Sequence, residues 1–152
     1  MSHTDTAAPP ERFNFARHLI ALNAGRAGKT ALIDDAGSLT YGQLADQVQR
    51  CSAALTALGL RREDRVLLLM HDCSDWVVSF LGALHAGVVP VCVNTLLTAK
   101  DYAYMLADSR AQAALVSGLL LPTLQTAMDA TRHEVRHLIV SRGKDLPAGA
   151  HD

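Results

Sequence analysis

The string Gly-Arg-Ala-Gly-Lys-Thr at residues 25–30 ends like a phosphate-binding P-loop. A P-loop needs another glycine five positions before the second one, so that successive backbone N–H groups wrap the phosphates. That position holds Asn23. The hydrophobic spacing also predicts a helix before the string and a strand after it, whereas a P-loop joins a strand to a following helix. We therefore interpret these residues as a helix end followed by a turn.

His71, Asp72 and Cys73 follow a predicted buried strand. Ligands of open α/β sheets gather at the carboxyl ends of strands, and a Cys–His pair can supply a nucleophile. In extended backbone His71 and Cys73 would share one face. The alternative is a loop in which Asp72 and Ser74 cap the next helix. We favour the loop, because helix starts select these residue types.

His133 and His137 are four positions apart and would share a face on a helix. Two histidines can begin a metal site, but a third ligand is needed and Glu134 points elsewhere at helical spacing. The surrounding residues are typical of a helix-to-strand junction. We therefore expect no metal here.

The elements that must position these residues follow from caps and hydrophobic spacing. Asn14 is a predicted cap for a helix over residues 15–24, which Gly25 stops. Asp-Ala-Gly at residues 35–37 predicts a hairpin between strands 30–34 and 38–40. Thr40 and Gln43 have capping-box spacing. The helix that they open carries one apolar stripe: Leu44, Val48, Cys51, Leu55 and Leu58, before Gly59 ends it.

The remaining chain alternates strand and helix. Strands are predicted over 65–70, 88–93, 113–117 and 137–141, with helices capped by Ser74, capped by Thr98 and spanning 119–130 with Pro122 in the first turn. Such alternation predicts right-handed crossovers, and hence a three-layer α/β/α fold with a mostly parallel sheet preceded by a β-hairpin. A last strand near residue 141 leaves an uncovered sheet edge, which suggests that more protein follows.

Composition excludes several classes of function. The 152 residues suit one domain. Lys plus Arg is 14 and Asp plus Glu is 15, so the net charge is −1. A nucleic-acid binder usually has a basic excess, which is missing here. A net charge near zero is compatible with self-association or a docking partner.

Other motifs are also missing. Three cysteines without a C-x-x-C pair argue against a disulfide framework and a cysteine zinc site, and favour reduced thiols in the cytoplasm. Neither the G-x-G-x-x-G of dinucleotide sites nor the G-x-S-x-G of hydrolases occurs. The alternative of an unrelated nucleotide-binding protein therefore finds no phosphate loop in this sequence. Residues 76–99 carry no formal charge, but Gly87, Pro90 and Asn94 break them into a short helix and a strand. We expect no membrane span.

A family resemblance rests on five strings. They are I-D-D-A-G at 33–37, T-Y-G-Q-L at 40–44, F-L-G-A-L-H-A-G-V-V-P-V at 80–91, N-T-L-L-T at 94–98 and D-Y-A-Y-M-L at 101–106. Together they resemble the opening of acyl-adenylate-forming (AMP-binding) enzymes, and in particular of benzoate–CoA ligases and close aryl–CoA ligases. The similarity runs from about residue 13 to residue 141.

The resemblance implies a two-step reaction. ATP activates an aryl carboxylate as an acyl-adenylate, and the thiol of coenzyme A then attacks, with magnesium and positioned donors stabilising phosphate charge. The family's phosphate loop, its ribose and aryl pockets and its catalytic lysine match no string in this chain, so no catalytic, cofactor-binding or metal residue is carried over. Some relatives place an arginine near coenzyme A phosphate where this chain has Leu96. Lys100 lies nearby, but a solvated helix-start lysine explains it better.

We therefore expect a flexible tail over residues 1–12, an N-terminal α/β subdomain of an AMP-binding ligase over 13–141, and a tail or the start of a continuation over 142–152. The leading hypothesis is an N-terminal portion of an aryl–CoA ligase that is inactive alone, binds no cofactor by itself and has the rest of the ligase as its partner. The alternative is an interaction module derived from such a ligase, docking to a larger ligase-like partner.

Overall fold

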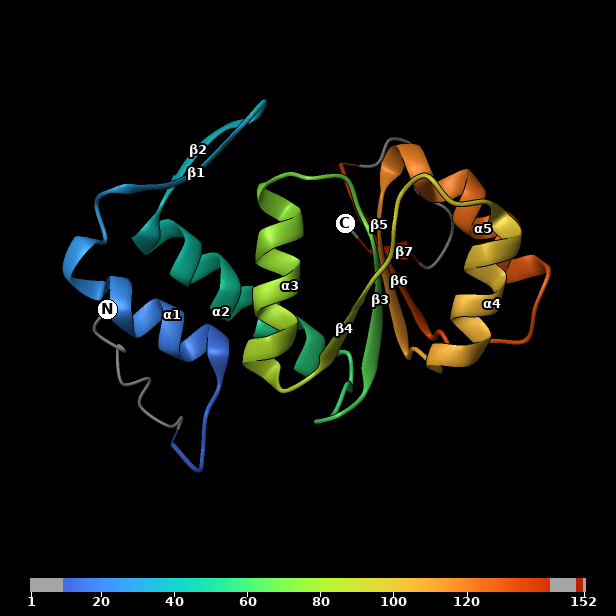
Figure 1. Ribbon diagram of the computed structural model, residues 1–152, viewed down its shortest axis with the longest axis horizontal. Coiled ribbons are helices and arrows are strands. Elements are labelled where there is room, and N and C mark those ends of the chain that lie inside the picture. The colour runs from blue at the N-terminus through green and yellow to red at the C-terminus, as the bar shows by residue number, and fades with distance from the viewer. Residues whose placement is uncertain (1–9, 143–149, 152) are drawn as a thin grey trace, which may run out of the picture.

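The structure is a computed structural model, and the residues it describes are 10–142 and, by their backbone, 150–151. The first part holds α1 (Phe15–Asn23), the 3-10 turn η1 (Ala24–Arg26), β1 (Thr30–Asp34), β2 (Gly37–Thr40) and α2 (Tyr41–Ala57) (Figure 1). The rest alternates strand and helix: β3 (Arg65–Leu69), α3 (Ser74–Ala86), β4 (Val89–Cys92), α4 (Ala99–Ser109), β5 (Ala113–Ser117), the 3-10 turn η2 (Gly118–Leu120), α5 (Leu121–Asp129), β6 (His137–Ser141) and β7 (Ala150–His151).

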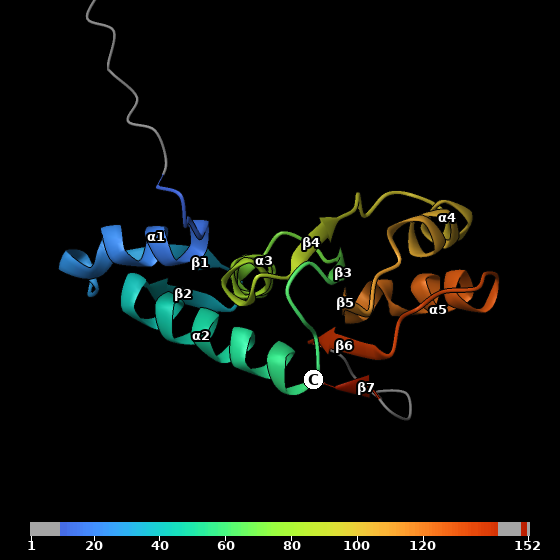
Figure 2. The ribbon, with the colours of Figure 1, turned by 90° about the horizontal axis from the view of Figure 1, so that it is seen from below.

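The strands from β3 to β7 form one parallel sheet in the order β4-β3-β5-β6-β7. β1 and β2 pair separately and antiparallel. Since β4 and β5 lie on opposite sides of β3, right-handed crossovers put α3 on one face of the sheet and α4 and α5 on the other. Figure 2 shows these three layers. The predicted α/β/α fold with its preceding hairpin is confirmed.

Local caps explain where the helices begin. The predicted caps at Asn14, Thr40 and Thr98 are confirmed. The Thr40 hydroxyl accepts the N–H of Gln43 at 3.2 Å, and the Gln43 side chain accepts the N–H of Thr40 at 2.8 Å. Each cap satisfies backbone donors that the first helical turn leaves without partners. Gly87 ends α3 as predicted, in a left-handed conformation with φ 78° that a glycine adopts without steric cost.

The predicted local cap of α3 is wrong. The helix begins at Ser74, after Asp72, and its N-cap residue Cys73 makes no side-chain capping bond. Instead the carboxylate of Asp34 in the hairpin accepts the N–H of Ser74 at 2.9 Å, from 40 positions away. A tertiary contact therefore supplies the acceptor that the local pattern assigns to neighbouring residues.

Two helix ends differ from the pattern. Gly25 is not the stop of α1, because the chain continues as η1 through Arg26. The Asn23 side chain stabilises this turn, donating to the carbonyl of Leu19 and accepting from Nε of Arg26, both at 2.7 Å. The predicted helix over 119–130 starts as η2 and becomes α-helical at Leu121, with Pro122 in its first turn as predicted.

The outer edge of β6 is not bare. Leu138 and Ile139 pair with Ala150 and His151 of β7, so the expectation of an uncovered edge is wrong over these residues. Two paired residues carry too little periodicity to be detected as a strand in the sequence. The predicted boundaries of the tails stay predictions, since most of residues 1–12 and 142–152 lie outside the described residues.

Three apolar clusters hold the layers together. The first packs α4 and α5 on one face of the sheet around Leu67, Tyr102, Leu106 and Leu124. The second packs α2 and α3 on the other face around Leu55, Leu68, Ala83 and Leu115. The third joins α1, α2, α3 and the hairpin through Ala16, Leu44, Val48 and Leu81. Within the described residues, no helix combines the length and apolarity that a membrane crossing needs.

Candidate functional site

The end of the sheet where β3, β5 and β6 finish is its carboxyl edge. The strand order reverses at β3, so the crevice between the ends of β3 and β5 is the topological switch point where open α/β sheets bind ligands. His71 closely follows β3, and its N–H donates to the Ser117 hydroxyl at the end of β5 at 3.0 Å. This bond ties the two loops that flank the switch point.

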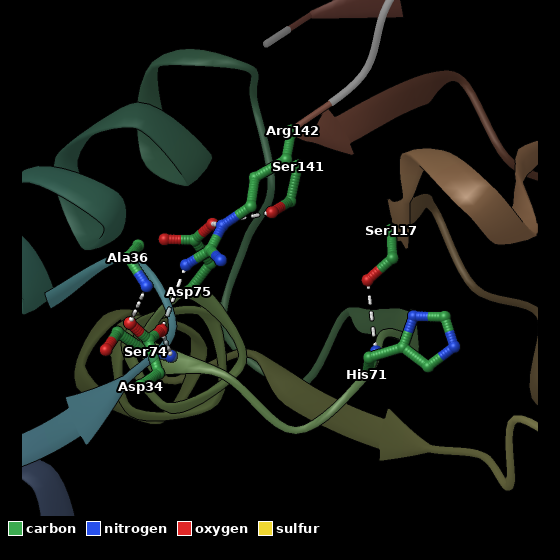
Figure 3. A network of polar contacts seen from close by, with 8 residues as sticks. All are labelled: Asp34, Ala36, His71, Ser74, Asp75, Ser117, Ser141 and Arg142. Atoms are coloured by element: carbon green, nitrogen blue, oxygen red, sulfur yellow. Dashed lines mark hydrogen bonds and ion pairs between the residues drawn. The ribbon is translucent and has the colours of Figure 1, made fainter.

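Arg142, one residue beyond β6, joins three elements at the same edge (Figure 3). Its Nη2 is 3.0 Å from Oδ2 of Asp34 in the hairpin, and its Nε is 3.0 Å from Oδ2 of Asp75 in the first turn of α3. The Ser141 hydroxyl also donates to Asp75, at 2.6 Å. We call Arg142, Asp34 and Asp75 the clasp.

The carboxylate of Asp34 is the most heavily bonded group of the clasp. It accepts the N–H of Ser74 at 2.9 Å, the guanidinium of Arg142, and the N–H of Ala36 at 2.9 Å. These donors stabilise the ionised carboxylate and hold the pKa of Asp34 well below its usual range. The two carboxylates in turn raise the pKa of Arg142. One guanidinium thus faces two carboxylates, and the clasp carries a net negative charge.

Two open hollows meet at the clasp, and both are lined by Asp75 and Arg142. The larger, about 430 Å³, has an apolar wall formed by Met70, Leu115, Ile139 and Val140. The smaller, about 200 Å³, is lined by the hairpin turn and by polar residues that include Ser38, Gln47 and Ser74. The Arg142–Asp75 pair lies where the apolar hollow meets the polar one.

The string at residues 25–30 is a structural turn. The N–H of Lys29 donates to the carbonyl of Arg26 at 2.9 Å. The carbonyls of Ala27 and Lys29 accept the N–H groups of Gly42 and Tyr41, each at 2.9 Å, at the start of α2. The string follows helical residues and leads into β1, so the interpretation as a helix end and turn is confirmed.

The other sequence candidates are not brought together as reactive groups. Within the described residues, the side chains of His71 and Cys73 share no hydrogen bond, and no three His, Cys, Asp or Glu side chains cluster as metal ligands. His133 lies after α5 in an irregular segment, where its Nδ1 accepts the N–H of Val135 at 3.2 Å, and His137 opens β6. The two histidines therefore do not share a helix face.

The cysteines are free thiols. Burial raises the pKa of Cys51 to about 11, and burial also raises the pKa of Cys92. A thiol with a raised pKa is a poor nucleophile at neutral pH. Cys51 has a packing role instead: a Cβ added to Gly82 of α3 would lie 2.5 Å from its sulfur, so α2 and α3 approach closely where Gly82 has no side chain.

The loop after β4 is held from beneath by Tyr102, which is fully buried. Its hydroxyl donates to the carbonyl of Asn94 at 2.8 Å and accepts the N–H of Leu97 at 3.2 Å. Asn94 also accepts the N–H of Leu96 at 2.8 Å. The loop is thus ordered, and it presents the 89% exposed Leu96 at the carboxyl edge, while Lys100 lies in the first turn of α4.

Sequence reasoning missed the clasp. Asp34 and Arg142 are 108 positions apart, and nothing in the spacing of either residue indicates the other. The one local signal is Asp34 at the hairpin turn, where an aspartate commonly accepts an N–H two residues on, as it does here from Ala36.

An open parallel sheet with hollows at its carboxyl edge is typical of α/β domains that bind ligands. Within that class, the chain belongs to the AMP-binding enzyme family, whose model matches residues 21–151. The resemblance found in the five strings is thereby confirmed.

Two of the relatives are named as aryl–CoA ligases. The chain is 53% identical over 88% of its length to the benzoate–CoA ligase of Thauera aromatica, and 41% identical over 78% to a 4-hydroxybenzoate–CoA/benzoate–CoA ligase of Rhodopseudomonas palustris. It covers 26% and 22% of these proteins, so it spans about a quarter of their length.

Solved structures agree. A benzoate CoA ligase from Burkholderia xenovorans LB400 matches with a TM-score of 0.83 and 50% identity, covering 86% of this chain and 26% of that one. An anthranilate CoA ligase solved with anthranoyl-AMP matches with a TM-score of 0.82 and 32% identity, covering 87% and 25%. This chain therefore has the fold of one portion of such ligases.

Proposed function

We propose that this chain is the opening portion of an aryl–CoA ligase, which converts benzoate or a related aryl carboxylate, ATP and coenzyme A to aryl-CoA, AMP and pyrophosphate through an acyl-adenylate. The observation that carries the proposal is the 53% identity to a benzoate–CoA ligase over 88% of the chain. The similarly high identity to the solved benzoate CoA ligase supports it.

In this proposal the chain has a structural role and supplies no catalytic group. Its partner is the remaining portion of the ligase. Magnesium and ATP phosphates need carboxylates and N–H groups that are available to them. The carboxylates of Asp34 and Asp75 are both bonded to Arg142, and the N–H of Ser74 at the start of α3 is taken by Asp34. The clasp therefore does not fit a magnesium or triphosphate site. We assign ATP, magnesium and coenzyme A binding to portions outside this chain.

A chimera tests the ligase assignment. The matching 137-residue segment of the Thauera aromatica enzyme is replaced by the corresponding residues of this chain. We expect benzoate-dependent pyrophosphate release to survive. A control chimera carries Leu67→Asp, which places a charge at a fully buried position of β3 and should abolish folding and activity. Loss of activity in a chimera that still folds would contradict the assignment.

The chain alone is proposed to be inactive. Because the proposal assigns the triphosphate site to portions outside this chain, the purified 152-residue protein should release no pyrophosphate from ATP with benzoate, above the level without benzoate. Benzoate-dependent release by the pure chain would overturn this part of the proposal. We also propose a cytoplasmic location, which the three free thiols support.

The alternative is an interaction module that docks to a larger ligase-like protein. The apolar wall of the larger hollow and the net charge of −1 favour it. Co-purification of the native chain with a larger ligase subunit would support this alternative. A native chain that runs as a monodisperse monomer would count against it, and against self-association.

A further inference from the structure

The hairpin turn is held to the rest of the molecule differently from the hairpin base. At the base, Ala31 and Leu32 pack against the apolar cluster of α1, α2 and α3. At the turn, Ile33 is 80% exposed. Among the described residues, the polar contacts that leave the turn all come from the carboxylate of Asp34, to Ser74 and to Arg142.

Arg142 reaches this carboxylate from the far side of the edge. It follows β6, whose side chains belong to the sheet clusters and not to the cluster beneath the hairpin. The side chain of Arg142 is 45% exposed, whereas the side chain of Asp34 is 13% exposed. The contact between turn and sheet is thus an ion pair with little apolar contact around it, and water and salt reach one of its partners.

We propose that the hairpin turn over Asp34–Gly37 is a strap that Arg142 fastens to the carboxyl edge, and that releasing Arg142 opens the wall between the two hollows. Asp75 and Arg142 line both hollows, and the turn lines the smaller one. When the guanidinium swings away, the turn keeps its base but loses its tie to the sheet, and the apolar and polar hollows become one groove. This inference concerns the fold and does not depend on the ligase assignment.

The carboxylate of Asp34 accepts two backbone N–H groups, and these respond differently when the strap opens. The bond from Ala36 is local, two residues along the chain, and persists when the turn moves as a unit. The bond from Ser74 joins the turn to α3 and breaks when the strap opens. A released strap therefore speeds amide hydrogen exchange at Ser74 and leaves exchange at Ala36 nearly unchanged.

The experiment is residue-resolved hydrogen exchange on the full 152-residue chain with Arg142→Gln. The matched control is Arg110→Gln. Both arginines have positive φ, 54° and 53°, and both pair through Nε with a carboxylate, Arg110 with Glu134 at 2.9 Å. We expect exchange at Ser74 to rise about tenfold in the Arg142 variant, as suits loss of a charge-assisted contact, and to stay at the wild-type rate in the Arg110 variant.

The dependence of exchange on salt is an independent test of the strap. Raising NaCl from about 0.1 M to about 1 M shortens the screening length from about 10 Å to about 3 Å and weakens the exposed pair. Exchange at Ser74 should therefore accelerate with salt in the wild type and much less in the Arg142 variant. The same measurements on the Thauera chimera cover the case in which a variant of the isolated chain fails to fold.

Three results would overturn the proposal that the hairpin turn is a strap. One is an unchanged Ser74 rate in a folded Arg142 variant. Another is acceleration spread evenly over α4 and α5, which would indicate general destabilisation. The third is equal acceleration at Ala36 and Ser74, which would mean that the turn unravels instead of opening as a unit.

Discussion

On one face of the sheet, α4 and α5 pack against β3 and β5 with fully buried side chains, among them Leu106, Leu124 and Val116. On the other face, α2 and α3 cover β3 but leave an open hollow beside Leu115 and Ile139. The first face is closed mainly by apolar packing. The second ends in hydrogen bonds and the ion pairs of the clasp.

The difference shows which parts of the chain are complete by themselves. Apolar packing has no charges that salt screens or pH titrates, so the α4–α5 face should behave as a fixed platform. The apolar wall of the hollow is exposed to water. Exposed apolar patches usually mark surfaces that contact another molecule or another part of the protein. In the proposed ligase, we therefore expect the α2–α3 face to meet other parts of the protein.

The sharpest test of this comparison is a pair of leucine truncations. Leu124→Ala on the closed face should destabilise the chain by about 3–5 kcal/mol, because the cavity cannot collapse. Leu115→Ala should cost nearer about 2 kcal/mol, because this side chain already borders the open hollow. Urea unfolding of both variants measures the difference. Equal losses would show that the two faces are packed alike.

The contact between α2 and α3 predicts the next largest effect. Gly82→Ala should destabilise by about 2 kcal/mol, since the new methyl group overlaps the side chain of Cys51. Adding Cys51→Ala should restore part of the loss by removing the sulfur, although the Cβ at 2.7 Å remains. Gly25→Ala is the control, because nothing lies within 4 Å of the position that its new methyl group would occupy. Calorimetric melting of the wild type, the two single glycine variants and the double variant measures these stabilities. An undiminished loss in the double variant would refute the proposed overlap.

The hydroxyl of Tyr102 predicts a smaller effect on the closed face. Tyr102→Phe leaves the carbonyl of Asn94 and the N–H of Leu97 without this partner, at a cost of about 1–2 kcal/mol. Tyr104→Phe, at a position 68% exposed, should cost almost nothing. Chemical denaturation compares the two, and amide exchange at Leu97 should rise only in the first. Similar stabilities would mean that the loop after β4 does not need this anchor.

The clasp predicts the smallest effect, and one that depends on pH. Because the pKa of Asp34 is lowered in the folded chain, its ionised form stabilises folding above the unfolded pKa of about 4, and this stabilisation is lost as the pH falls further. Asp34→Asn should therefore show a shallower loss of stability between about pH 5 and pH 2 than the wild type. Asp101 and Glu134 have lowered pKa values too, but they contribute equally to both proteins. Stability profiles that run parallel with pH in the variant and the wild type would contradict this role of the Asp34 carboxylate.

Sequence reasoning succeeded where the cause is local. The capping box of Thr40, the stop at Gly87 and the uniformly apolar run of β3 after Arg65 depend on neighbours within a few residues, so their spacing is visible in the chain. The rejection of the Gly-Lys-Thr string at residues 25–30 also depended on local order, since a helix precedes it and a strand follows.

It failed where the partner is distant. The sequence pattern assigned the cap of α3 to Ser74 and Asp72, whereas the acceptor is Asp34 in the hairpin. The same carboxylate binds Arg142, and no periodicity connects positions 34 and 142. The pairing of β6 with β7 and the hollow between α3 and β6 were invisible for the same reason.

The sequence by itself determined the elements up to β6, the parallel α/β class and the family resemblance, because periodicity, caps and motif strings are properties of short segments. Only the tertiary structure decided the strand order, the partner of Asp34 and the open hollow beside Leu115. Those features arise when right-handed crossovers bring distant segments to one edge of a sheet, and there the charges of separate segments meet for the first time.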